Sequence, residues 1–286
     1  MKILFLNVSQ ELIKLLRQNI DENNLKWIED KVESVIQNRS SKELYLCYSL
    51  LASKIKEDEI LTFPLKNSEV TKYLISQNAN LLEIARVYLL TRVLEFDHDF
   101  FSIKVANIIE VSDSQETETF LKFLILFPNP ETYRNVAVDA IRTNIASIFD
   151  AISLNNPYPS LYFNDQQWNQ MYLKAAFMQR DLSMILDIDQ RANKDLARII
   201  SDYAHERWAA SRLVDPYFWR PVGPYIDEAL LVDMKRLLHS MDHKEKIAGA
   251  LSCSVSEHPE AKAILEEFPE LKKNIDQQSI SWINAI

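Results

Sequence analysis

The sequence predicts an all-α protein, and two observations support this prediction. Glycine accounts for only 2 of the 286 residues, whereas it usually makes up about 7 % of a globular protein. Sheets with tight hairpins need more residues that adopt positive φ. In addition, helix-capping residues followed by apolar residues at helical spacing recur along the chain. We therefore expect about ten to fourteen helices joined by short connections.

Antiparallel helix pairs stacked side by side are the arrangement that many short helices favour. We expect a curved, right-handed α-α superhelix of the HEAT or armadillo type, inferred from helix density because no repeat of fixed period stands out. Residues 1–286 are predicted to form a single helical domain, with an N-terminal half over about 1–154 and a C-terminal half over about 155–286. The irregular segment 155–160 joins the two halves.

In the first half, helix signals appear at three places. Residues 40–43 have the Ser-x-x-Glu form of a capping box and precede an apolar helix face. Residues 81–96 are apolar on nearly every side, which predicts a helix covered by its neighbours. Asn129 and Pro130 have the order of a helix cap and a first helical residue, and the predicted helix continues through Ile148.

In the second half, asparagines precede two of the predicted helices. Asn164 is expected to cap a helix whose apolar stripe is Trp168, Met171, Tyr172 and Ala175. After a break at 187–192, Asn193 is expected to cap a long helix that ends near Leu213. Three further helix starts are predicted at Asp242, Pro259 and Pro269.

The overall charge and the short apolar stretches limit the partners and the compartment. The net charge is −9 and no run of Lys and Arg occurs, so a nucleic-acid backbone would be repelled. No apolar stretch approaches the roughly 20 residues of a transmembrane helix, and Asn7 ends the N-terminal apolar run before a signal-peptide core is complete. We expect a cytoplasmic protein with no nucleic-acid partner and no transmembrane segment. Cys47 and Cys253 are expected to be buried and reduced.

Several catalytic and cofactor motifs are absent from the sequence. The only glycines, Gly223 and Gly249, are too far apart for a phosphate-binding loop, a dinucleotide fingerprint or a serine-hydrolase elbow. His205 and Glu206 resemble the start of a zinc-protease helix, but the second histidine of that motif is replaced by Ala209. No Cys-x-x-Cys pair occurs. We therefore expect no cofactor.

Two carboxylate-histidine pairs have a spacing that is used in di-iron helix bundles. Glu95 precedes His98, and Asp202 precedes His205, by three positions in each case. The simpler interpretation places the first pair at a solvated helix end and pairs Asp202 with Arg198 one turn back. We favour this interpretation and expect no metal ligand.

The segment 193–225 combines aromatic and guanidinium side chains in a mixture typical of binding surfaces. A second polar aromatic segment, 155–164, would face it if the two shared a groove. In the alternative interpretation, the aromatic residues pack a turn against the helices, and Arg207 and Arg212 bind helix-terminal carbonyls or acidic neighbours; both interpretations stay open here. The candidate ligand- or partner-binding residues are Tyr203, His205, Glu206, Arg207, Trp208, Arg212, Trp219, Arg220, Asn156 and Tyr158.

The same segments resemble the EboA family of bacterial proteins. The motifs that carry the resemblance are Asn-Asn-Pro-Tyr-Pro at 155–159, Trp-Asn-Gln-Met at 168–171 with Lys-Ala at 174–175, Asp-Gln-Arg-Ala-Asn at 189–193, Tyr-Ala-His-Glu-Arg-Trp-Ala-Ala at 203–210 and Trp-Arg-Pro-Val-Gly-Pro at 219–224. The resemblance is distinctive from about 133 to 264. It implies gene neighbours that include a UbiA-type prenyltransferase, TIM-barrel and TatD-like metal enzymes and a dehydroquinate-synthase-like protein. It also implies a role in making or exporting a secondary metabolite such as the scytonemin precursor, and it supplies no catalytic residues.

Two functions remain open from the sequence. In the first, which we favour, a helical scaffold or carrier supports the synthesis or export of a bacterial secondary metabolite by binding a partner enzyme of the same gene cluster or an aromatic precursor. In the second, the chain is an enzyme of that pathway, with His205 as general base and Arg207 or Arg212 stabilising negative charge. Glu206 is a further catalytic candidate, and a metal-dependent variant would use the two carboxylate-histidine pairs.

Overall fold

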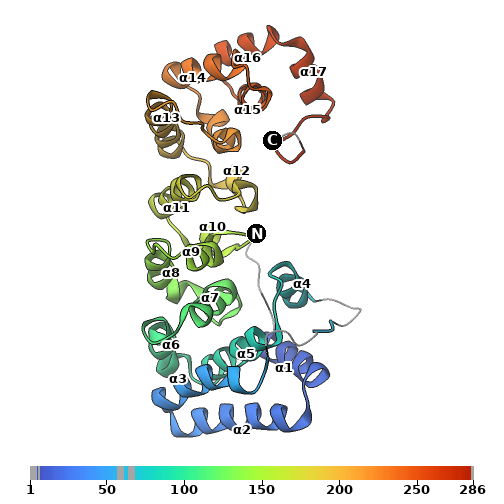
Figure 1. Cartoon of the computed structure of the whole chain (residues 1–286), viewed down its shortest axis with the longest axis vertical. Helices are drawn as coiled ribbons and strands as arrows, with labels where there is room; N and C mark the ends of the chain where they lie inside the picture. Colours follow the sequence, from blue (N-terminus) through green and yellow to red (C-terminus); the bar gives the residue numbers. More distant parts are fainter. Residues whose placement is uncertain (1–4, 6, 57–60, 64–67, 285–286) are drawn as a thin grey trace. The chain divides into compact units, whose positions relative to one another are not determined.

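The computed structural model describes residues 5, 7–56, 61–63 and 68–284. These residues form α-helices and 3₁₀ helices and contain no strand (Figure 1), so the predicted all-α class is confirmed. The described residues contain 17 α-helices. This number exceeds the expected range because several helices are only one or two turns long. None of the described helices is both long enough and apolar enough to cross a membrane.

The chain divides into two compact units, Met1–Tyr162 (unit 1) and Phe163–Ile286 (unit 2). The helices of unit 1 are α1 (Val8–Asn19), α2 (Glu22–Asn38), α3 (Ser41–Leu50), α4 (Glu69–Ser76), α5 (Leu81–Phe96), α6 (His98–Ala106), α7 (Ser114–Phe123), α8 (Arg134–Ala140), α9 (Ala146–Ser153) and α10 (Tyr158–Tyr162). The helices of unit 2 are α11 (Asp165–Phe177), α12 (Ile188–Arg191), α13 (Lys194–Ala209), the 3₁₀ helix η6 (Pro216–Tyr225), α14 (Glu228–Leu238), α15 (His243–Ser254), α16 (Pro259–Glu266) and α17 (Pro269–Asp276). The single domain and the superhelix stay predictions.

Helix α5 is the centre of the unit 1 core, as its apolar sequence predicts. It is buried along nearly its whole length and packs against α1, α2 and α7. Its buried Arg86 has an acidic partner, as a buried charge requires. Arg86 lies 3.4 Å from the carboxylate of Glu116 on α7, and the Tyr48 hydroxyl donates to the backbone carbonyl of Glu116 at 2.7 Å.

Two predicted features of unit 1 are corrected by the structure. Ser40 accepts the backbone N–H of Glu43 at 3.2 Å, but the Glu43 carboxylate bonds to α2 side chains, so only half of the predicted capping box forms. The helix predicted from Pro130 through Ile148 is wrong. A 3₁₀ turn opens the segment, α8 ends at Ala140, and the Thr143 side chain accepts the N–H of Ile145 in place of a helical carbonyl.

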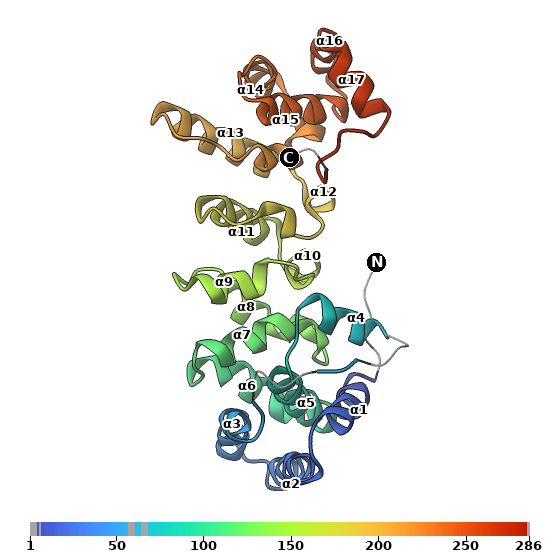
Figure 2. The ribbon, with the colours of Figure 1, turned by 45° about the vertical axis from the view of Figure 1, so that its right-hand side comes forward.

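The predicted helix starts of unit 2 are confirmed. Asn164 forms a complete capping box with Gln167, and Asn193 accepts the N–H of Leu196 at 2.9 Å. Helices α15, α16 and α17 begin where their caps and prolines predict. Figure 2 shows α14, α15 and α16 packed together.

Helix α13 ends at Ala209 rather than near Leu213, and a local turn explains the difference. Ser211 adopts the left-handed conformation with φ 54°. The backbone N–H of Ser211 and that of Arg212 then close on the carbonyls of Trp208 and Arg207, both at 2.9 Å. Such paired bonds satisfy the last carbonyls of a helix and stop its propagation.

Close backbone packing joins η6 to α15. A Cβ atom at Gly223 would lie 2.4 Å from Val255 Cγ2 and 2.6 Å from the Ser252 carbonyl oxygen. Only glycine therefore fits at this contact. Cys47 in unit 1 and Cys253 in unit 2 are free and buried, as predicted.

Candidate functional site

Two of the predicted site residues, Asn156 and Tyr158, are buried in unit 1. The Asn156 side-chain amide donates to two backbone carbonyl oxygens, at 3.0 and 2.9 Å, and the Tyr158 hydroxyl donates to the carbonyl of Pro130 at 2.8 Å. Both side chains fix the turn before α10 and are covered by unit 1. Their expected place in a groove with residues 203–220 stays a prediction.

Trp208 and Trp219, also predicted site residues, are in contact with each other. Trp219 is fully buried, and Trp208 of α13 stacks on it with ring centroids 5.7 Å apart. Arg236 of α14 places its guanidinium carbon 3.9 Å from the Trp208 ring centroid. Trp219 therefore supports the half-buried Trp208 from within the core, and its predicted binding role stays a prediction.

Arg220 is held by an acidic partner. Its Nε and Nη2 atoms donate to the two carboxylate oxygens of Asp189 at 2.8 and 2.7 Å, and Nη1 donates to the Tyr217 hydroxyl. The hydrogen bonds that Arg220 donates to Asp189 raise the pKa of its guanidinium. This two-pronged pair ties η6 to α12, a contact that neither sequence interpretation named for Arg220.

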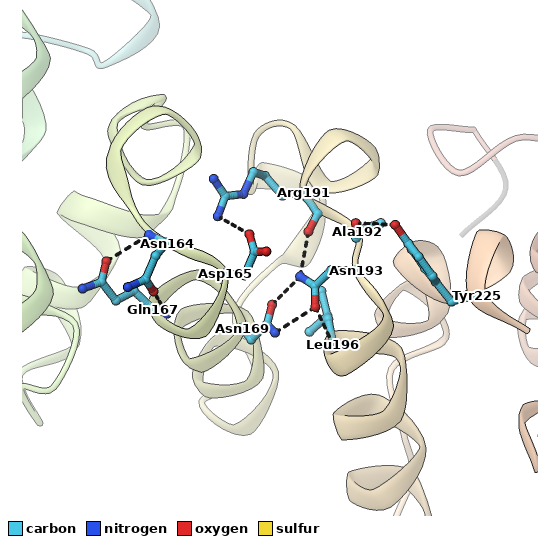
Figure 3. A network of polar contacts seen from close by, with 9 residues as sticks. All are labelled: Asn164, Asp165, Gln167, Asn169, Arg191, Ala192, Asn193, Leu196 and Tyr225. Atoms are coloured by element: carbon cyan, nitrogen blue, oxygen red, sulfur yellow. Dashed lines mark hydrogen bonds and ion pairs between the residues drawn. The ribbon is translucent and has the colours of Figure 1, made fainter.

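The motif residues around Asn169 and Asn193 form a second set of satisfied contacts, which we call the asparagine junction (Figure 3). The two side-chain amides exchange hydrogen bonds of 3.0 and 2.9 Å. Asn193 also caps α13 and donates to the carbonyl of Arg191 at 3.1 Å. The pair therefore fixes α11 against the start of α13.

Arg191 and Tyr225 complete the asparagine junction. Arg191 bonds to the carboxylate of Asp165 at 3.1 Å, and its guanidinium carbon lies 5.2 Å from the Trp168 ring centroid. The Tyr225 hydroxyl donates to the carbonyl of Ala192 at 2.9 Å (Figure 3). Two of the motifs that carry the family resemblance therefore hold the fold together at this point.

His205 has a buried acidic partner that the sequence interpretation missed. Its Nε2 atom lies 2.6 Å from Asp233 Oδ1, and the Ser201 hydroxyl donates to the other oxygen of Asp233 at 2.6 Å. Asp233 comes from α14 and is buried, whereas more than half of the His205 side chain is exposed. The sequence does contain a signal for this contact, which is a carboxylate among the apolar residues 230–234. Such a carboxylate needs a polar partner when its helix face is buried.

The two carboxylate-histidine pairs belong to different units. Glu95 accepts a hydrogen bond from the Ser9 hydroxyl at 2.5 Å, and His98 is half-buried in the same unit. Asp202 is exposed and does not form the expected ion pair with Arg198. Within the described residues, no cluster of three or more His, Cys, Asp or Glu side chains is arranged to hold a metal ion.

Four of the predicted site residues do line one cavity, a groove of about 610 Å³ between α11 and α13. We call it the α11–α13 groove. Its α11 wall has two apolar side chains, one amide and one amine, and its α13 wall is mostly charged. The lining residues are Gln170, Leu173, Lys174 and Phe177 from α11, and Tyr203, Glu206, Arg207 and Arg212 from α13 and the turn after it.

Arg207 is held in place at the groove wall. Its Nε and Nη2 atoms donate to the carbonyl oxygen of Leu213 at 3.1 and 2.9 Å. The guanidinium carbon lies 6.0 Å from the Tyr203 ring centroid, and Tyr203 packs edge-on against the buried Phe218. Arg207 thus binds a carbonyl of the turn that follows its helix, as the alternative interpretation expects. Part of its donor fork remains for a ligand.

Arg212 differs from Arg207 because its exposed side chain forms no hydrogen bond or ion pair with any described residue. The groove lining carries three cationic side chains and one carboxylate, a formal charge of 3 − 1 = +2, although the whole chain carries −9. Burial lowers the pKa of Lys174, one of the three cations. The α11–α13 groove is therefore a locally positive site in an acidic protein.

Comparisons with known proteins agree with the resemblance in the sequence. Residues 8–223 match the model of a family described as metabolite traffic protein EboA. Searches of curated proteins and of solved structures found no match. The matched range begins earlier and ends earlier than the motifs suggest; it includes all the groove residues and excludes Asp233. Because the match covers most of its length, the chain belongs to the EboA family of metabolite traffic proteins.

Proposed function

We propose that this protein is a helical carrier in metabolite traffic and that the α11–α13 groove binds an aromatic precursor. The observation that carries the proposal is the groove itself, with an apolar wall facing a charged wall in about 610 Å³. Small-molecule sites have volumes of about 300–1,000 Å³ and combine apolar surface with a few placed polar groups. Phe177 and Tyr203 supply aromatic surface to such a ligand.

The groove lining favours binding over chemistry. Its eight residues contain no His, Cys or Ser side chain, and Glu206, Lys174 and Tyr203 are the groups there that could act as an acid, a base or a nucleophile. Holding a ligand needs only complementary shape and charge, whereas acid-base or nucleophilic catalysis needs a reactive group within hydrogen-bond reach of the ligand. His205 is on the same helix as Glu206 but does not line the groove.

A scaffold role is compatible with the same groove. Many consecutive helices pack against one another within each unit, which supports a HEAT-like stack there, and such stacks offer extended surfaces to protein partners. We expect those partners to be enzymes encoded in the same gene cluster. We also expect the protein to work in the cytoplasm, because no described helix is fit to cross a membrane.

Native mass spectrometry of the full chain, purified from cells that contain the gene cluster, tests the carrier proposal. We expect a mass excess over the denatured chain that corresponds to a small organic molecule. Phe177→Ala should remove this excess, because it deletes an exposed aromatic side chain of the groove without opening the core. Val232→Ala, an exposed apolar residue of α14, is the matched control and should keep the ligand. A bare wild-type chain would overturn the carrier proposal and leave protein partners as the function to test.

The enzyme remains the second candidate, and the contact between His205 and Asp233 is the observation that favours it. A buried carboxylate 2.6 Å from Nε2 orients the ring and leaves Nδ1 as a base when Nε2 carries the proton. The same carboxylate also accepts the Ser201 hydroxyl, so Ser201 is not activated by the histidine as a nucleophile would be.

Incubation with a metabolite extract separates the enzyme from the carrier. Wild-type protein and His205→Gln are each incubated with the same extract, and the small molecules are quantified by mass spectrometry. If His205 is a general base, one compound is consumed by the wild type and persists with the variant. Identical metabolite profiles would reject this mechanism.

A further inference from the structure

We propose that the α11–α13 groove selects a small molecule that has an apolar, ring-sized body and one anionic group such as a carboxylate or sulfonate. Arg212, with the remaining donors of Arg207, holds the anion, while Leu173 and Phe177 cover the body. This inference rests on the proposed function, since it names the ligand class of the same groove.

The arginine side chains of unit 2 differ in whether the protein supplies them with a partner. Arg220 is occupied by Asp189, and Arg236 lies over the Trp208 ring. Arg212 lines the groove, yet its guanidinium has no partner among the described residues. A guanidinium fork matches the two oxygens of a carboxylate or the oxygens of a sulfonate, so an anionic ligand supplies the partner that the protein does not.

The backbone around Ser211 places Arg207 and Arg212 at the groove before a ligand arrives. The Arg212 N–H is bonded to the Arg207 carbonyl at 2.9 Å, across the left-handed turn at Ser211. The Leu213 carbonyl fixes the Arg207 side chain. The Arg207 guanidinium is therefore held before binding and loses little conformational freedom when a ligand binds, which favours affinity.

The facing wall of the groove exposes apolar side chains to water. Phe177, at the end of α11, is 71 % exposed although it is aromatic. Leu173 lies one turn before it on the same helix. A flat apolar body placed on this wall would remove both side chains from water. This burial of apolar surface contributes favourable free energy to binding. The neighbouring cations would hold the anionic end of the same molecule.

Glu206 can test whether the ligand is selected by its negative charge, because its carboxylate lines the groove beside the cations. Like charges close together repel, so Glu206 opposes an anionic ligand and has little effect on a neutral one. If charge selects the ligand, removing this carboxylate strengthens anion binding. Removing Arg212 weakens it.

Two dyes with the same rings test the proposal on the full chain. Anilinonaphthalene sulfonate carries one negative charge, and phenylnaphthylamine is its uncharged parent; the affinity of each is measured by fluorescence titration. We expect the anionic dye to bind at least about 5-fold more tightly. Arg212→Gln should weaken the anionic dye about 10-fold, as the loss of a charged hydrogen bond implies, and change the neutral dye by less than about 2-fold. Glu206→Gln should strengthen the anionic dye about 2-fold.

Matched variants show where the dyes bind and distinguish a failure of the anion proposal from a failure of the groove proposal. Arg198→Gln removes an equal charge from α13 at an exposed position outside the groove, and should alter neither affinity. Phe177→Ala should weaken both dyes about 5-fold, because both cover the same ring. Equal affinities for the two dyes, unchanged by Arg212→Gln but lowered by Phe177→Ala, would overturn the anion proposal and keep the groove. Affinities that Phe177→Ala does not change would overturn the groove as well.

Discussion

The asparagine junction and the α11–α13 groove use similar residues for opposite purposes. Both lie between α11 and α13, and both combine amide, guanidinium and aromatic side chains. At the junction, Asn169 and Asn193 satisfy each other, and Arg191 has a carboxylate partner. In the groove, Arg212 is without a partner and Phe177 is exposed. Residue type therefore does not separate a structural contact from a binding site, whereas the presence of a partner in the folded chain does.

The largest expected difference is between Trp219 and Phe177. Trp219→Ala should lower the free energy of unfolding by about 3–5 kcal/mol, because it leaves a cavity at a fully buried position. Phe177→Ala should change it by less than about 0.5 kcal/mol, because the side chain is already exposed. Urea denaturation monitored by circular dichroism measures both. Similar losses in the two variants would contradict the division into structural and binding aromatics.

The asparagine pair gives the next largest effect. Asn193→Ala should cost about 1–2 kcal/mol of unfolding free energy, because it removes the cap of α13 and leaves the Asn169 amide without its partner. Once Asn169 is also alanine, the second substitution should cost less than it does alone. A double-mutant cycle on urea midpoints measures this coupling. Strictly additive costs would mean that the two amides do not act as a pair.

Substitution of Arg220 and of Arg212 should have smaller effects on stability, and the two effects should differ. Arg220→Gln should lower the free energy of unfolding by about 1 kcal/mol, because it breaks a two-pronged but partly exposed bond to Asp189. Arg212→Gln should leave stability within about 0.5 kcal/mol and change only ligand binding. Thermal melts of both variants check the prediction. A clear loss of stability in Arg212→Gln would indicate a structural partner and argue against the groove.

The features that could be predicted from the sequence are those set by residues close together in the chain. The caps of α11, α13 and α15 depend on a side chain and a backbone N–H two or three positions away, and all form as expected. The helix predicted from Pro130 through Ile148 failed because its apolar spacing continues past Thr143, where a side-chain hydrogen bond replaces the helical one. Helix starts were more predictable than helix ends for this reason.

The candidate site was predicted only on the side that one segment supplies. Tyr203, Glu206, Arg207 and Arg212 come from one stretch of mixed aromatic and charged residues, and all line the groove. The facing wall with Phe177 was not predicted, because only tertiary packing brings α11 alongside α13. For the same reason Asp233 was missed; it lies 28 positions from His205 in the sequence.

The smallest expected effect at neutral pH concerns the buried thiol of each unit, which allows the two units to be compared. Burial raises the pKa of Cys47 in unit 1 and of Cys253 in unit 2 from 9.0 to about 12. The folded state therefore favours the protonated thiol, and the stability that each thiol contributes is complete below pH 9.0 and is lost as pH rises toward about 12.

Near pH 8, alkylation of each buried cysteine should occur only when its unit opens, so the rate at each cysteine reports the opening of its own unit. Mass spectrometry of Cys47→Ala and Cys253→Ala during alkylation gives the two rates separately. If a groove ligand slows labelling of Cys253 and leaves Cys47 unchanged, unit 2 alone is stabilised by binding, as a groove built entirely from unit 2 requires. Equal protection of both thiols would show that the units open together.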